Sequence, residues 1–104
     1  MSKLSDVDRY IVRPFVKGLI RLLILGVLSK GESYAYQIYR HIVDLVKSRV
    51  SLSTFYTILK DLEVRGFVVK VDGKYVLTEK GLLAITILLA KYPYLAQILS
   101  SLKR

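Results

Sequence analysis

The sequence predicts a mainly α-helical chain with a small two-stranded β hairpin, an α+β arrangement built as one domain over residues 1–104. Three observations support this prediction. Apolar residues recur at helical spacing through most of the chain. One short β-branched stretch is followed by Asp72-Gly73, the strongest two-residue hairpin signal. A length of 104 residues suits a single hydrophobic core.

The first long helix is expected to begin near Pro14, because proline at the first helical position loses no needed hydrogen bond. Residues 1–13 carry alternating charge and show little pattern. Apolar residues then cover nearly every side of the helix until residues 29–32 end it. We therefore expect this helix to be buried almost all round.

Two further helices are predicted from their caps and apolar stripes. Ser33 is the expected N-cap of the second helix, and Ser51 that of the third. Gly66 is a natural C-cap for the third helix. The stripe of the second helix is Ala35, Ile38, Ile42, Leu45 and Val46, and that of the third is Leu52, Phe55, Leu59 and Leu62.

The hairpin and the C-terminal segment complete the order of elements. Strands are expected over residues 67–71 and 74–77, on either side of the turn. Thr78 is the expected cap of a fourth helix, which Tyr92-Pro93 interrupts before the last segment. The order helix, helix, helix, strand, turn, strand, helix is that of a winged helix-turn-helix, whose third helix enters the DNA major groove. The predicted organisation is a winged-helix core over 14–81 and a C-terminal dimerisation helix over 82–104.

Composition limits the possible functions. The chain has 17 basic and 8 acidic side chains, for a formal charge of +9, which favours a polyanionic partner. Nucleic acid is the first candidate, an anionic membrane surface the second, and a merely solubilising charge the third. A membrane-spanning helix needs about 20 consecutive apolar residues, and the sequence has no such run. The N-terminus does not look like a secretory signal, so we expect a cytoplasmic protein.

Catalytic and metal-binding groups are scarce. Cysteine is absent, which excludes disulfides, thiolate catalysis and Cys-ligated metal sites. One histidine, His41, cannot form a metal cluster by itself. The sequence has no glycine-rich phosphate loop and no Ser/His/Asp constellation. It therefore predicts a protein that is not an enzyme and needs no cofactor.

Four motifs, in order, carry a resemblance to a known family. They read LLILGVLSKG at 22–31, YAYQ at 34–37, VSLSTFYTILKDL at 50–62 and YVLTEKG at 75–81. These motifs resemble those of the PadR-like transcriptional regulators, and the similarity extends over roughly residues 19 to 81. Ala35 stands where that family has glycine, and Leu52 and Thr57 stand where it often has proline. The resemblance implies a winged-helix DNA-binding protein and a role for the pair Tyr34 and Tyr36.

The third helix supplies the candidate base-reading residues. At about 100° per residue, Ser53, Thr57 and Lys60 lie opposite the apolar stripe and would face base edges. Thr54 and Tyr56 flank them, where a hydroxyl group can donate to phosphate. The alternative is that this surface is an ordinary solvated helix face.

Further candidates would contact the DNA backbone. The free N–H groups at the start of the second helix, near Ser33, Tyr34 and Tyr36, form a ready phosphate site. Alternatively, the tyrosines pack there with their hydroxyls in water. Three cations lie beside the third helix or on the wing: Arg49, Lys70 and Lys74.

The apolar excess predicts a homodimer. One small core cannot absorb both the first helix and the final stripe, Leu95, Ile98, Leu99 and Leu102. A symmetric dimer would bury them and hold the third helices of its two chains about 34 Å apart.

The expected function is that of a transcription regulator that binds double-stranded DNA at specific sequences and represses transcription. The alternatives are a non-specific architectural DNA-binding protein and a protein-interaction module of the transcription machinery. The sequence identifies no small-molecule effector.

Overall fold

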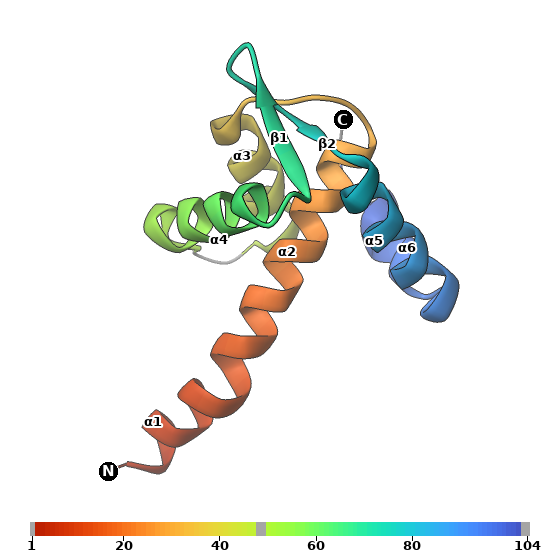
Figure 1. Ribbon diagram of the computed structural model, residues 1–104. Helices are drawn as coiled ribbons and strands as arrows, with labels where there is room; N and C mark the ends of the chain where they lie inside the picture. Colours follow the sequence, from red (N-terminus) through yellow and green to blue (C-terminus); the bar gives the residue numbers. More distant parts are fainter. Residues whose placement is uncertain (1, 48–49, 103–104) are drawn as a thin grey trace.

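A computed structural model describes residues 2–47 and 50–102. Its elements are drawn in Figure 1. In chain order they are α1 (Lys3–Val7), the π-helical turn η1 (Asp8–Val12), α2 (Arg13–Ser29), α3 (Ala35–Val46), α4 (Leu52–Val64), β1 (Val68–Val71), β2 (Lys74–Leu77), α5 (Glu79–Lys91) and α6 (Leu95–Ser100). The predicted fold class, mainly α with a two-stranded wing, is confirmed.

The N-terminal helix is longer than the sequence predicts. It does not begin near Pro14, because α1, η1 and α2 follow one another without a break. In a regular helix the proline ring would collide with the carbonyl four residues earlier. Here the preceding turn is wide, since the Arg13 N–H donates to the Asp8 carbonyl five residues back. The N-terminal part of this helix projects from the body of the molecule (Figure 1).

The core surrounds the C-terminal half of α2. Residues 22–28 of that helix are all buried, whereas residues 13–15, 17 and 18 are exposed, so the prediction of a helix buried almost all round is right only for its C-terminal half. Helices α3 and α4 pack on one side of α2, while α5 and α6 pack on another. Phe55 of α4 is fully buried, and the ring of Tyr39 meets it edge-on at 5.3 Å. The Tyr39 hydroxyl donates to the Val50 carbonyl at 2.6 Å, which ties α3 to the start of α4.

The helix caps mostly match their predictions. Ser51 Oγ accepts from the Thr54 N–H at 2.9 Å, and Thr78 Oγ1 accepts from the Gly81 N–H at 3.1 Å. Gly66 follows α4 with φ of +86°. The prediction for Ser33 is wrong by one residue, because Tyr34 occupies the N-cap of α3.

Ser33 instead joins α3 to the wing. It is 2% exposed and pairs with Tyr75 in an antiparallel bridge, with N···O distances of 2.8 and 3.1 Å. Strands β1 and β2 pair antiparallel, with Val71 opposite Lys74. Asp72 and Gly73 form the predicted turn, with φ of 51° and 83°. Tyr75 is next to Lys74, the first residue after the turn, so the bridge holds the turn end of this hairpin beside the start of α3.

The C-terminal helix packs on its own chain. Leu99 and Leu102 are buried against Gly26 of α2, where an added Cβ would lie 2.6 Å from Leu99 Cδ2. Lys30 Nζ donates to the carbonyls of Leu99 and Leu102 at 3.0 and 2.8 Å. Two of the four residues predicted at a dimer interface thus serve the core of one chain. Leu95 and Ile98 remain only half-buried.

Candidate nucleic-acid interface

The outer face of α4 presents the predicted base-reading residues together. Ser53, Thr57 and Lys60 are exposed, whereas Phe55 and Leu59 on the opposite side are buried. Among the described residues, no helix is long and apolar enough to cross a membrane, and no three acidic or histidine side chains gather as metal ligands. An exposed polar face on a buried helix is the arrangement that suits a helix entering a groove.

Hydrogen bonds leave these side chains available for a partner. The Thr57 hydroxyl donates to the Ser53 carbonyl at 2.9 Å, so its methyl group and oxygen lone pairs stay open. Thr54 Oγ1 accepts from Ser51 Oγ at 3.0 Å, so the Thr54 hydroxyl hydrogen can go to a phosphate. Lys60 Nζ lies 4.0 Å from Glu63, a long contact that holds the ammonium only loosely.

The wing lies on one flank of α4. Tyr56 is 44% exposed and meets Phe55 edge-on. Burial raises the pKa of the Tyr75 hydroxyl on β2, and the negative charge of Glu63 adds to this effect. Tyr75 therefore stays neutral. Lys70 on β1 is exposed, with its Nζ 5.6 Å from the centre of the Tyr75 ring.

Other predicted residues are placed differently. Lys74 Nζ lies 3.7 Å from a Glu32 carboxylate oxygen and 5.3 Å from the centre of the Tyr34 ring, so its charge is partly neutralised beside the turn of the wing. Tyr34 and Tyr36 are about half exposed, at 48% and 53%. Arg49 lies outside the described residues.

The other flank of α4 faces α2 across a groove of about 510 Å³. The groove is lined by Lys17, Arg21, Ser53, Thr54, Thr57, Ile58, Lys60, Asp61 and Val64. Arg65 pairs with Asp61 at 3.0 Å, which offsets the negative charge in the groove. Sequence reasoning missed Lys17 and Arg21 as site residues. The signal was present, because these cations recur four residues apart and so share a helix face.

The arrangement is suited to a duplex. Hydroxyl groups and an ammonium project from the middle of α4, with cations on both flanks, from Lys70 on the wing side and from Lys17 and Arg21 on the α2 side. A major groove about 12 Å wide admits one helix and is bordered by phosphates on both sides. Central polar groups can therefore meet base edges while flanking cations meet phosphates.

Comparisons with known proteins found solved structures of similar fold. The structure is similar to a transcriptional regulator from Clostridium thermocellum, at 19% identity over 88% of this chain and 97% of that chain, with a TM-score of 0.68. It is similar to a protein from Streptococcus mutans UA159, at 30% identity over 83% and 91% of the two chains, with a TM-score of 0.62. A third similar structure, described as that of a candidate transcriptional regulator from Thermoplasma acidophilum, has 22% identity over 88% and 98%, with a TM-score of 0.64.

A search among curated proteins found no match. The PadR-like family of transcriptional regulators matches over residues 24–86, which run from the middle of α2 into α5 and include α4 and the wing. The match covers more than half of the chain. The chain therefore belongs to the PadR-like family of transcriptional regulators.

Proposed function

We propose that this regulator is a homodimer that binds double-stranded DNA at specific sequences and represses transcription there. The observation that carries the proposal is the outer face of α4, where Ser53, Thr57 and Lys60 stand exposed between two cationic flanks. Repression is the simplest mode of regulation, because a dimer bound over a promoter blocks that promoter without any further contact.

The side chains of α4 suit direct reading of bases. A lysine ammonium donates to the O6 and N7 acceptors of guanine, and a threonine methyl packs on the methyl group of thymine. Ser53 can donate to or accept from a base edge, since its hydroxyl rotates freely. Lys60 and Thr57 thus give α4 the means to prefer particular base pairs over others.

The homodimer is supported by an apolar surface that one chain leaves open. A groove of about 630 Å³ runs between α2, α5 and α6, and Leu95 and Ile98 line it. The side of α2 beside the groove is also apolar, with Phe15 67% exposed. Leu4 and Ile11 extend the exposed apolar surface along the projecting helix, at 83% and 57%.

We assign this surface to a second copy of the chain. A helix that projects with exposed apolar residues can lie in the groove of its partner, and a two-fold axis makes the exchange reciprocal. Leu99 and Leu102 would then hold α6 against α2 of their own chain, while Leu95 and Ile98 contact the partner. The symmetric pair presents two copies of α4 to successive half-sites about 34 Å apart.

Selection from a pool of random-sequence duplexes at physiological salt tests the proposed function. Wild-type protein should enrich one short motif. Lys60→Ala should lower the preference at one base pair by about 1 to 3 kcal/mol, whereas Lys91→Ala, at an exposed position at the end of α5, should leave the motif unchanged. A pool without enrichment, or the same motif for Lys60→Ala, would contradict specific reading by α4.

A further inference from the structure

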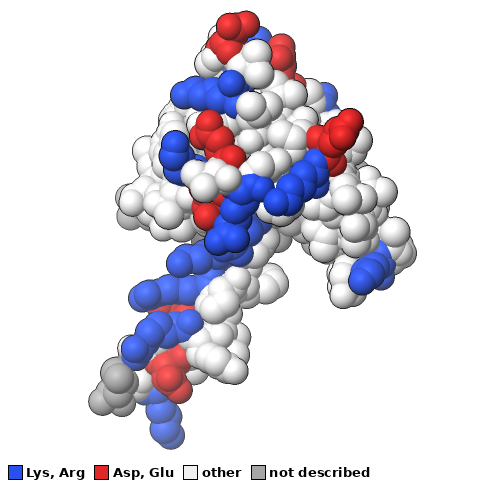
Figure 2. Space-filling model, in the orientation of Figure 1, with Lys and Arg blue, Asp and Glu red and all other residues white. Residues whose placement is uncertain are grey.

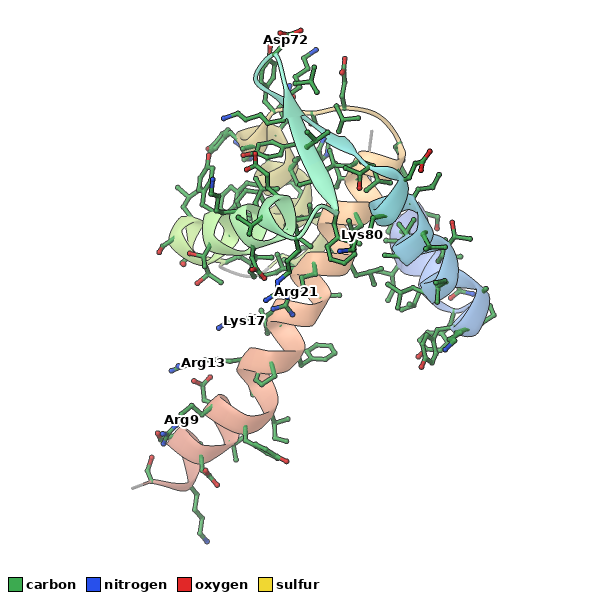
Figure 3. The ribbon with its side chains drawn as sticks, viewed as in Figure 1. Arg9, Arg13, Lys17, Arg21, Asp72 and Lys80 are labelled. Carbon is green, nitrogen blue, oxygen red and sulfur yellow. The ribbon has the colours of Figure 1, made fainter. Side chains whose placement is uncertain are left out.

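Four cations follow one side of the N-terminal helix. Arg9, Arg13, Lys17 and Arg21 occur at every fourth position, and Figure 3 shows all four pointing to the side of the helix on which α4 lies. Figure 2 shows basic side chains along this helix as far as the body of the molecule. We call these four residues the basic ridge.

The ridge has dimensions that match a DNA backbone. Four residues of helix advance about 6 Å along the axis, so the ridge spans about 18 Å, the rise of about five base pairs. In a regular helix each step of four residues also rotates by about 40°. The wide turn between Arg9 and Arg13 counteracts this rotation, because more residues complete a turn there.

The ridge is continuous with the candidate interface on α4. Lys17 and Arg21 line the groove that contains Ser53 and Thr57. A second groove of about 270 Å³ joins Arg13 and Lys17 to Ser51 and Thr54 at the start of α4. A third, of about 380 Å³, runs along all four ridge residues. Three adjoining hollows therefore connect the base-reading face with the whole length of the ridge.

We propose that the basic ridge is a second DNA-binding element, which contacts backbone phosphates on the flank of α4 opposite the wing. This inference rests on the proposed function, since α4 must first lie in a major groove. The ridge then follows the phosphates that leave that groove, and it adds affinity and fixes orientation without reading sequence. It also extends the interface beyond the base pairs that α4 reaches.

The four cations do not contribute equally. Arg13 Nε pairs with Asp8 Oδ2 at 2.7 Å, so phosphate must compete with a carboxylate there. Arg9 contacts Ser5 Oγ at 3.4 Å. Lys17 and Arg21 are exposed and lie next to α4. We therefore expect Lys17 and Arg21 to contribute most, Arg9 less, and Arg13 least.

An anionic membrane is the rival partner for a helix with one basic and one apolar side. The observations favour DNA. The ridge shares its grooves with polar side chains of α4, whereas an interfacial helix buries its apolar face in lipid. The apolar side of this helix instead leads into the groove between α2, α5 and α6, which a flat lipid surface would not fill.

Titration of a fluorescein-labelled duplex at several salt concentrations tests the ridge. Each phosphate that the protein no longer neutralises should lower the magnitude of the log–log salt slope by about 0.9, and lower affinity about five-fold at ~0.15 M salt. Lys17→Gln should show this effect, whereas Lys91→Gln, which removes an exposed cation at the end of α5, should not. The triple variant Arg9→Gln, Lys17→Gln, Arg21→Gln should lose affinity by about a hundred-fold.

The charge-conserving triple variant Arg9→Lys, Lys17→Arg, Arg21→Lys should bind as wild type does, because phosphate binding requires charge rather than a particular shape. The proposal is overturned if the triple glutamine variant keeps wild-type affinity and salt slope, and the proposed function then still stands. If wild-type protein binds no duplex, both fall. Binding to phosphatidylserine vesicles that the glutamine variant loses, with duplex binding unchanged, would assign the ridge to lipid.

Discussion

Gly81 lies where α5 closely approaches the base of the wing. A Cβ at this position would overlap the carbonyl oxygen of Phe67 and lie 2.7 Å from Leu77 Cδ1. The backbone oxygen cannot move away freely, because it accepts a hydrogen bond from the Thr78 N–H at 3.2 Å. Glycine therefore allows the cap of α5 to sit directly on the base of the hairpin.

Gly81→Ala is expected to lower the free energy of unfolding by about 1 to 3 kcal/mol, since overlap with backbone forces a shift of α5. Urea unfolding followed by circular dichroism measures the change. Gly18→Ala is the control, because its Cβ would meet nothing within 4 Å. That helical substitution should raise stability by about 0.5 to 1 kcal/mol. Equal effects of the two substitutions would contradict the packing described here.

Tyr75 links stability to alkaline pH. Burial raises the pKa of its hydroxyl above the ordinary value of 10.0, so the folded chain holds the proton more tightly than the unfolded chain. This contribution is complete below the ordinary pKa and is lost as pH rises through the folded pKa. Melting temperatures should therefore fall above about pH 10, and less so for Tyr75→Phe. An identical pH dependence in the variant would contradict this assignment.

The positions of some site residues could be predicted from the sequence, whereas the contacts of others could not. The outward position of Ser53, Thr57 and Lys60 follows from helical periodicity and could be predicted. The partial neutralisation of Lys74 could not, because Glu32 lies in a distant loop that the Ser33–Tyr75 bridge brings to the wing. Periodicity describes one element at a time, whereas that ion pair depends on how two segments meet.

Among the elements, the N-terminal helix differs most from its prediction. The alternating charges before Pro14 make the amphipathic pattern there hard to recognise. A proline is also typical of the first position of a helix, so Pro14 is interpreted as the start. The π-helical turn that accommodates Pro14 has no simple sequence signal. The hairpin, by contrast, was predictable because Asp72 and Gly73 both adopt the positive φ angles that its turn requires.

Helix α6 was predicted as a helix but with a different set of neighbours. Leu99 of α6 and Leu102 just after it pack on Gly26, an approach that the absence of a side chain at this position of α2 permits. Such a complementary gap cannot be seen from periodicity alone. Leu99→Asp would therefore place a charge in the core of one chain, and it would unfold the protein rather than report on a dimer.

The wing is expected to bind backbone without reading sequence. Lys70→Ala should weaken binding to all duplexes alike and reduce the salt slope by about one for each phosphate that Lys70 neutralises. Lys91→Ala, at an exposed cation on α5, should leave both quantities unchanged. Parallel titrations of a selected and an unrelated duplex measure the effect. A changed ratio between the two duplexes would mean that Lys70 reads bases.

For the whole molecule, the proposed dimer would give the two sides of the N-terminal helix separate roles, with the apolar side facing a partner and the basic side facing DNA. Phe15→Asp should place a charge in the interface and shift the protein from dimer to monomer in sedimentation experiments. Tyr36→Asp, at a similarly open position on α3, should remain dimeric. A dimeric Phe15→Asp variant would contradict the proposed interface.

The central claim is that two copies of α4 read one duplex from a symmetric dimer. Hydroxyl-radical footprinting of wild-type protein on its selected duplex tests this claim most directly. We predict two protected regions related by two-fold symmetry, with centres about 34 Å apart, or one turn of DNA. Uniform protection along the duplex, or a single protected region without symmetry, would contradict it.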